Sequence, residues 1–160
     1  MDFACNATTV IAAAPALVFE LITDIDRLPE WNAEVVKVVE RSGTDVGAEW
    51  VVGMHALHTR WNSRSRVVAI DAERGRFAYR SQSDDGNPSY ADWRWEVVPH
   101  TTGARVAVAV EAHPRTFWRR VLLSRIRPSG LQKAMDESLR ALGSLLAAQP
   151  TAKATNDNES

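Results

Sequence analysis

Residues 10–43 read VIAAAPALVFELITDIDRLPEWNAEVVKVVERSG, and this stretch says more about the fold than any other. Alternating side chains up to Ala12 are typical of the end of a strand. Pro15 then stands where a first helical residue belongs, because its fixed φ suits that position. The apolar side chains that follow recur at i, i+3, i+4 and i+7, which predicts an amphipathic helix; they are Val18, Leu21, Ile22 and Ile25. Pro29 stops a second short helical turn.

The rest of the chain divides at Pro114 into a strand-rich part and a helical part. We predict strands over residues 3–12, 35–41, 48–57, 59–70, 76–83, 90–98 and 104–112. We predict helices over residues 15–25, 27–31 and 116–147, the last interrupted at residues 128–130 by Pro128. The fold class is therefore α+β: a curved antiparallel sheet of six or seven strands around a long C-terminal helix, with two short helices after the first strand. A cup of this kind implies a cavity for a ligand.

Length and composition favour one domain. The chain has 160 residues, of which 45% are hydrophobic and 24% charged, as in an ordinary globular protein. We predict a single ligand-binding domain over residues 1–147 and a disordered polar tail over residues 148–160. In the C-terminal helix an apolar stripe is available to cover the concave face of the sheet; it comprises Leu131, Met135, Leu139, Leu142 and Leu146.

Charge and cysteine content argue against several classes of function. The 19 basic and 20 acidic residues give a net charge of −1, so the overall charge provides no electrostatic argument for an anionic membrane as a partner, and we expect no nucleic acid. The lone Cys5 excludes an intrachain disulfide and a multi-cysteine zinc site, and it fits a cytoplasmic location. The longest apolar run, residues 10–22, is too short for a bilayer span and has no basic leader. We therefore expect no integral membrane segment and no secretory signal.

No constellation of catalytic or metal-binding residues stands out, so catalytic residues stay unassigned. His55 and His58 are three apart on a strand, which directs them to opposite faces and argues against a shared metal. We expect His100 and His113 to be exposed, one in a turn and one at a strand end. No serine lies in a nucleophile elbow and no glycine-rich phosphate loop occurs. We accordingly predict no metal and no cofactor.

Strand parity gathers most of the tryptophans and a few polar side chains on one face of the sheet. Asp92, Arg94 and Glu96 alternate with the tryptophans of their strand, which places the tryptophans on the concave side. Hydroxyl groups on that side need hydrogen-bond partners, either a ligand oxygen or water, or else each other and the backbone. The candidate ligand-binding residues are Trp50, Met54, Trp61, Ser63, Ser65, Tyr79, Ser81, Trp93, Trp95 and Met135.

Two further features leave alternatives open. Tyr79 could serve as a general acid only if it were activated, because an unperturbed tyrosine titrates near about pH 10. A run of arginines near Pro128 suits contact with a membrane surface or a partner, or simply a solvated helix face; its members are Arg119, Arg120, Arg125 and Arg127.

Several local motifs occur in a recognisable order. Residues 14–19, APALVF, join a small residue and proline to a helix with an aromatic side chain, and residues 28–31, LPEW, precede the second strand. Further matches are residues 47–50, 61–67 and 74–77, with Trp93, Trp95, Pro99 and Gly103 in the last hairpin. Over about residues 3–147 the chain resembles the START/Bet v1-like (SRPBCC) superfamily, which has the helix-grip fold, and in particular bacterial polyketide cyclase/dehydrase-like proteins. These motifs identify a fold rather than a chemistry.

The resemblance implies a hydrophobic cavity between the sheet and the long helix. Members of the superfamily cyclise or dehydrate polyketides, or carry lipids and hormones. We favour a carrier or sensor of a small hydrophobic molecule, whether aromatic, polyketide-like or lipid, because no acid–base pair converges on the concave face. A polyketide cyclase or dehydratase and a protein-interaction adaptor are the alternatives. The ligand's identity and the oligomeric state are not specified by the sequence.

Overall fold

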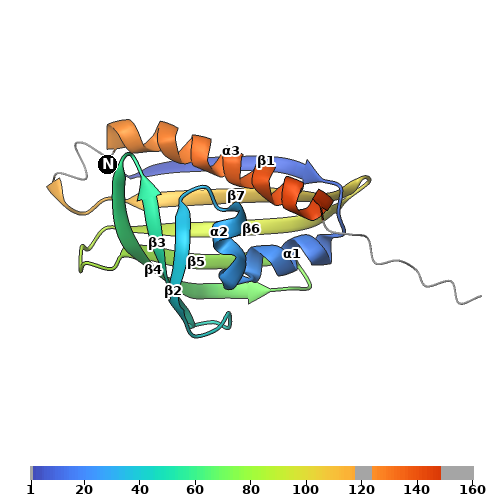
Figure 1. Ribbon diagram of the computed structural model, residues 1–160, viewed down its shortest axis with the longest axis horizontal. Helices are drawn as coiled ribbons and strands as arrows, with labels where there is room; N and C mark the ends of the chain where they lie inside the picture. The colour runs from blue at the N-terminus through green and yellow to red at the C-terminus, as the bar shows by residue number, and fades with distance from the viewer. Residues whose placement is uncertain (1, 118–123, 149–160) are drawn as a thin grey trace, which may run out of the picture.

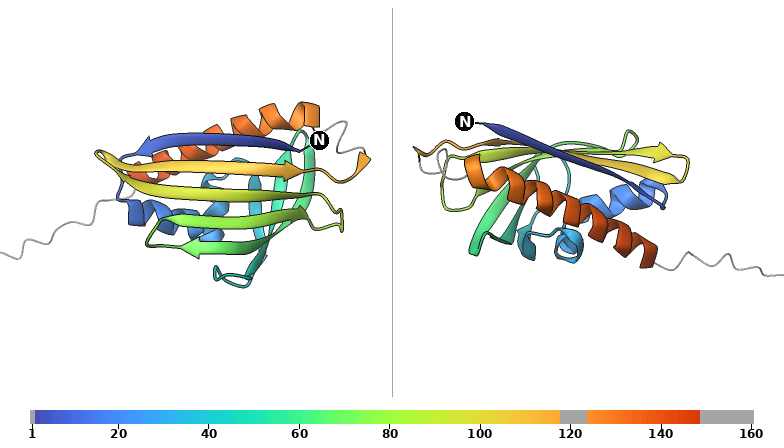
Figure 2. Two further views of the ribbon diagram at one scale, coloured as in Figure 1. Left: turned by 180° about the vertical axis from the view of Figure 1, so that it is seen from behind. Right: turned by 90° about the horizontal axis from the view of Figure 1, so that it is seen from above.

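The computed structural model describes residues 2–117 and 124–148 of the chain. Its strands form one sheet, and its helices lie on a single side of that sheet (Figure 1, Figure 2). In chain order the elements are β1 (Phe3–Ile11), α1 (Pro15–Thr23), the 3-10 turn η1 (Ile25–Arg27), α2 (Leu28–Trp31), β2 (Val35–Arg41), β3 (Glu49–Ala56), β4 (Thr59–Asp71), β5 (Arg76–Ser83), β6 (Tyr90–His100), β7 (Gly103–His113) and α3 (Ser124–Ala148).

The sheet has seven strands in the order β1-β7-β6-β5-β4-β3-β2, and every neighbouring pair is antiparallel. The strands from β2 to β7 form a meander, and β1 joins it beside β7. The first two strands are therefore the two edges of the sheet. The segment from Pro15 to Trp31, which contains α1 and α2, carries the chain from one edge to the other across the open face.

The sheet curves strongly around the helices. Register shifts interrupt the pairing of β2 with β3 and of β4 with β5, the latter between Val67 and Ala69. Such bulges bend the strand and increase its twist. As a result β2 and β3 run steeply across the direction of β1, β7 and β6 in Figure 1. The curvature makes a concave side, on which all the helices lie.

The core lies between the concave side and α3. The apolar stripe predicted for the C-terminal helix, from Leu131 to Leu146, is buried as expected. Strand parity is also confirmed: Trp95 is 4% exposed on the concave side, whereas the side chain of its neighbour Arg94 is 59% exposed on the outer side. Within the described residues, no helix combines the length and the apolar character that a membrane crossing requires.

Pro128 does not interrupt α3, contrary to the prediction. Its missing N–H and its ring disfavour a helix interior by about 3 kcal/mol. Tertiary contacts on both sides outweigh that preference: Arg127 pairs with Glu34, and Leu131 is buried. The Pro128 carbonyl also accepts a hydrogen bond from the Cys5 thiol, with a sulfur–oxygen distance of 3.6 Å. Since each buried leucine contributes about 1.5–3 kcal/mol, the apolar stripe is sufficient to hold the helix together.

The remaining differences concern the ends of elements. β6 continues to His100 and β7 begins at Gly103, so the turn between them is shorter than the predicted one. α1 ends at Thr23 rather than at residue 25, and Ala148 closes α3 instead of opening a tail. The start predicted for the last helix overlaps residues 118–123, and the predicted tail beyond residue 148 also lies outside the described residues.

Candidate functional site

A cavity of about 450 Å³ opens between the sheet and the N-terminal part of α3, and we call it the inner cavity. Its walls come from β3, β4, β5, β6 and the first described turns of α3, so the curvature of the sheet creates it. Five of the predicted ligand-binding residues line the inner cavity: Met54, Trp61, Ser63, Ser81 and Trp93. Leu131 and Arg127 contribute from α3.

The other five predicted residues lie on the same concave side but deeper, and they do not line the inner cavity. Trp50, Ser65, Trp95 and Met135 are buried, and Tyr79 is partly buried among them. Ring contacts connect the two groups. The Tyr79 ring stacks on Trp93 with centroids 6.0 Å apart, and it meets Trp50 edge-on at 4.9 Å. The deeper residues thus form the support behind the cavity wall.

Two of the hydroxyl groups predicted to need partners, those of Ser63 and Ser81, find them within the protein. Ser63 donates a hydrogen bond to the carbonyl oxygen of Gln82 at 3.3 Å. The indole N–H of Trp93 donates to the Ser81 hydroxyl at 3.0 Å. Because Ser81 accepts in this bond, its own O–H hydrogen is left to donate elsewhere. Ser63 and Ser81 therefore present different groups to the cavity, an acceptor oxygen and a donor hydrogen.

Burial governs the chemistry of Tyr79. Loss of solvent around the phenol raises the pKa of Tyr79 to about 12, and a hydrogen-bond interaction with Trp95 only partly opposes this. At neutral pH the phenol consequently keeps its proton. A raised pKa makes Tyr79 a weaker acid, the opposite of the activation that general acid catalysis would require.

The wall of the inner cavity contains an ion pair that no sequence pattern predicts. Glu34, in the turn before β2, binds Arg127 of α3 through two contacts, each 2.5 Å long, from Nη1 to Oε1 and from Nη2 to Oε2. The guanidinium of Arg127 also lies 5.9 Å from the centre of the Trp61 ring. The arginine predicted to belong to a basic outer patch thus turns inward. Glu34 and Arg127 are 93 positions apart, so no local pattern indicates their pairing.

A second group of polar side chains, around His113, also lines the inner cavity. His113 is half-buried rather than exposed as predicted, because it stacks on the Tyr90 ring at 4.6 Å and contacts Asp2 at 2.9 Å. His100 is exposed, as predicted, and so are His55 and His58. Ser89 accepts a hydrogen bond from the backbone N–H of Arg115 at 2.9 Å. No group of three or more His, Cys, Asp or Glu side chains suited to a metal ion occurs in the described part of the chain.

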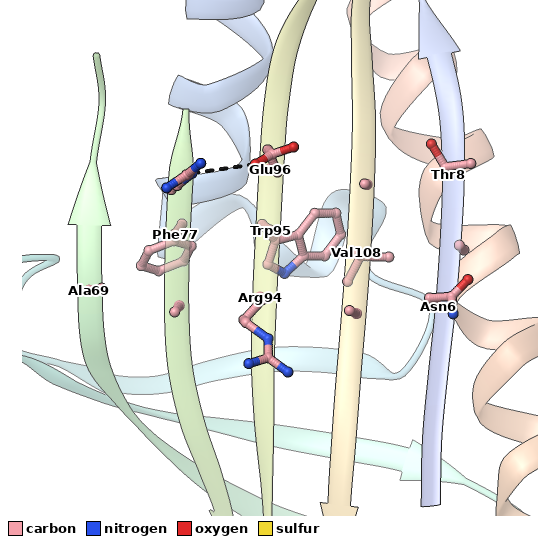
Figure 3. Close-up of a pocket in the computed structure, with 13 residues that line it drawn as sticks. Asn6, Thr8, Ala69, Phe77, Arg94, Trp95, Glu96 and Val108 are labelled. Atoms are coloured by element: carbon pink, nitrogen blue, oxygen red, sulfur yellow. Dashed lines mark ion pairs between the residues drawn. The ribbon is translucent and has the colours of Figure 1, made fainter. Parts of the chain in front are cut away.

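A second hollow, of about 590 Å³, lies on the outer side of the sheet (Figure 3). Alanine side chains from β4, β5 and β7 form its floor, and polar side chains such as Asn6 and Arg94 stand around it. The charged groups at its rim already pair with one another, Arg76 with Glu96 at 3.4 Å and Arg94 with Glu111 at 3.0 Å. The outer hollow therefore reflects small side chains on an uncovered sheet, and the inner cavity is the better candidate site.

Comparison with known proteins finds a matching family and similar solved structures. Residues 3–147 match the family described as polyketide cyclase/dehydrase and lipid transport, whereas no curated protein matches the chain. Among solved structures, an aromatase/cyclase from Streptomyces is similar with a TM-score of 0.76 and 15% identity, covering 95% of this chain and 98% of that one.

Two other structures extend the comparison. Ara h 8.0201 has a TM-score of 0.70 and 16% identity, over 93% of this chain and 100% of that one. A norcoclaurine synthase from Thalictrum has a TM-score of 0.68 and 15% identity, over 92% and 95% of the two chains. At such identities the likeness concerns the fold alone, and it confirms the helix-grip fold. The family match over nearly the whole described length shows that the chain belongs to the polyketide cyclase/dehydrase and lipid transport family.

Proposed function

We propose that the chain binds a small hydrophobic molecule in the inner cavity, as a carrier or sensor. The observation that carries this proposal is the wall itself, in which the large apolar side chains of Met54, Trp61, Trp93 and Leu131 line the cavity together with hydroxyl and charged groups. Sites for small molecules are typically apolar pockets of about 300–1,000 Å³ with a small number of polar groups. The inner cavity, at about 450 Å³, fits that description. The family's description, which includes lipid transport, supports the same proposal.

The aromatic lining favours a flat, aromatic or polycyclic ligand. Trp93 is held on one side by the parallel ring of Tyr79, at an interplanar angle of 15°. A ligand ring can therefore stack or pack edge-on against an indole whose position is fixed, and little freedom is lost on binding. Direct contacts between the ligand and the deeper predicted residues Trp50, Ser65, Tyr79, Trp95 and Met135 stay a prediction.

Cyclisation or dehydration of the same ligand is the alternative, because the fold neighbours include an aromatase/cyclase. The titratable groups at the cavity and behind its wall argue for binding without turnover. Glu34 is engaged by Arg127 and His113 by Asp2, while burial keeps Tyr79 protonated. An adaptor function loses one of its supports, because Arg127 turns toward the cavity instead of the outer surface.

A cavity-filling variant tests the proposal without removing any wall residue. Ala91 of β6 lines the inner cavity, so Ala91→Phe places a ring in the space that the ligand would use. We expect the affinity for an uncharged aromatic probe such as naphthamide, measured by quenching of tryptophan fluorescence, to fall by about tenfold or more, which corresponds to at least about 1.4 kcal/mol.

The matched control is Ala78→Phe, which adds the same ring to the outer side of the neighbouring strand. It should leave the affinity for naphthamide unchanged. Equal affinities of the wild type and Ala91→Phe would contradict binding in the inner cavity. Native mass spectrometry of the gently purified chain adds the identity of any molecule that co-purifies, and multiple turnover of a polyketide-like substrate above its spontaneous rate would establish the enzymatic alternative.

A further inference from the structure

We propose that the ligand of the inner cavity is a hydrophobic carboxylic acid in its ionised form, and that Arg127 binds the ligand's carboxylate in competition with Glu34. This inference rests on the proposed function and names the chemical class of its ligand. It depends on the position and partners of Arg127, on the backbone hydrogen bonds of Glu34, and on the kinds of hydrogen-bonding groups that the cavity presents.

The ion pair is removed from water yet lies at the cavity. The side chains of Arg127 and Glu34 are 17% and 10% exposed, and both residues belong to the cavity wall. A buried ion pair contributes little net stability, because the cost of removing two charges from water offsets their attraction. The pair therefore is not accounted for by stability alone. It does place the guanidinium of Arg127, a cationic group with several N–H donors, in the cavity wall.

Arg127 is already arranged to receive a carboxylate. Its Nη1 and Nη2 atoms both point at the two oxygens of Glu34, which is the planar, two-bond geometry that guanidinium groups form with carboxylates. A carboxylate of the ligand can make the same two bonds. The Trp61 ring, 5.9 Å from the guanidinium, supports Arg127 independently of Glu34 and also lines the cavity beside it.

Glu34 can leave without any rearrangement of the main chain. Its backbone N–H is bound by the side-chain oxygen of Asn32 at 3.1 Å, and its carbonyl oxygen accepts from the N–H of His55 at 2.8 Å. These bonds fix the backbone, so only the side chain of Glu34 has to rotate. Exchange of one carboxylate for another also keeps Arg127 paired, and no isolated charge is left on the guanidinium.

Three of the hydroxyl groups in the wall favour a ligand with acceptor oxygens. Ser81 accepts from the Trp93 indole, Ser89 from the backbone of Arg115, and the Tyr90 hydroxyl from the Arg115 guanidinium at 3.2 Å. A hydroxyl that accepts in this way still has its hydrogen to donate. Together with Arg127 these groups suit a carboxylate better than an ammonium group, which has only donors and would meet a like charge.

The test compares two ligands that differ only in charge, naphthoate and naphthamide, on the full chain at neutral pH. Calorimetry should show that the wild type binds naphthoate about tenfold or more tightly than naphthamide. Arg127→Gln should abolish this preference while the affinity for naphthamide stays nearly the same. Glu34→Gln keeps the shape of the side chain but removes its charge, so it should increase the affinity for naphthoate several-fold and leave that for naphthamide unchanged.

Two controls keep the result interpretable. Arg60→Gln removes another cation of the cavity wall, one that is exposed on β4, and it should preserve the preference. The double variant with Glu34→Gln and Arg127→Gln leaves no unpaired buried charge, so it serves if the single Arg127 variant does not fold; it too should bind the two ligands equally. If the wild type binds naphthamide as tightly as naphthoate, or if the double variant still prefers naphthoate, this inference is overturned while the proposed function stands. If neither ligand binds, the proposed function fails with it.

Discussion

Gly75 ends the turn that joins β4 to β5, and it also ties this turn to β6. It lies between β4 and β5 with φ at +64°, and its carbonyl accepts a hydrogen bond from the N–H of Val97 on β6 at 2.8 Å. A Cβ atom there would stand 2.1 Å from the carbonyl oxygen of Val97. Both the positive φ and this close approach require glycine at the position.

A pair of glycine variants separates these two requirements. Gly75→Ala must tolerate the positive φ and also move backbone away from Val97, whereas Gly86→Ala has a φ of +81° with nothing within 4 Å of the new methyl group. The positive φ alone costs about 1–2 kcal/mol. We expect urea unfolding to show that loss for Gly86→Ala and a clearly larger one for Gly75→Ala. Equal losses would mean that the contact with Val97 relaxes without cost.

At the scale of single elements, α3 contains residues that work against a helix. Gly143 lies inside it, and a Cβ atom there would meet the nearest heavy atom, Cγ1 of Ile11, at 3.8 Å, an ordinary contact. Glycine in a helix interior is about 0.8–1.0 kcal/mol less favourable than alanine. Gly143→Ala should therefore raise the free energy of unfolding by about that amount. Thermal and urea unfolding measure it, with Ser144→Ala, an exposed neighbour, as the control that should gain less. Destabilisation by Gly143→Ala would contradict this expectation, because it would mean that the new methyl group has less room beside Ile11 than the distance of 3.8 Å indicates.

The elements show where sequence reasoning succeeds and where it does not. β5 has the predicted bounds, because alternation from Arg76 to Ser83 is bracketed by turn residues on both sides. α3 passes through Pro128, although a proline predicts a break in a helix. The prediction considers only the backbone hydrogen bond that proline removes, whereas the burial of Leu131 beyond it stabilises the helix. Elements whose limits are set by their own residues are predictable, and those held by distant contacts are not.

The residues of the candidate site are likewise only partly predictable from local patterns. Parity along each strand is a local property, so it placed Trp61, Ser63 and Trp93 on the concave side correctly. Depth within the cup depends on how far the sheet curls, and for that reason Trp50 and Trp95 proved to lie behind the cavity wall. The pairing of Glu34 with Arg127 needs the whole fold, because it joins the turn before the second strand to the last helix.

Across the whole molecule, the uncovered side of the sheet is tied together by ion pairs between neighbouring strands. Arg76 faces Glu96, and Arg80 faces Asp92 directly across the β5–β6 pair. Arg94 continues the series to Glu111 on β7. Such exposed pairs contribute about 0.2–1 kcal/mol each, and they also make this side of the sheet unsuited to stacking on another apolar surface.

Acid should weaken this network through Asp92. The hydrogen bonds from Arg80 lower the pKa of Asp92 below its ordinary value of 3.8, against the opposing effect of burial. A lowered folded-state pKa means that the stabilisation is complete above the unfolded value and is lost as the pH falls through the folded one. We expect Asp92→Asn to cost about 0.5 kcal/mol at pH 6. Its urea midpoint should approach that of the wild type below about pH 3. A constant difference between the two proteins across this range would contradict the pairing.

β1 pairs with β7, from Phe3 opposite Ala112 to Ile11 opposite Ala104. During synthesis β1 therefore leaves the ribosome long before β7, its neighbour in the described sheet, exists. At about 5–20 residues per second, translation of the intervening hundred or so residues takes on the order of 5–20 s. For that time the apolar side of β1, with Cys5, Ala7 and Ile11, has neither a neighbouring strand nor α3 to cover it. A nascent β-segment in this condition is prone to pair with another chain, so the yield of folded protein in a cell should depend more on what shields these residues during translation than on the stability of the finished sheet.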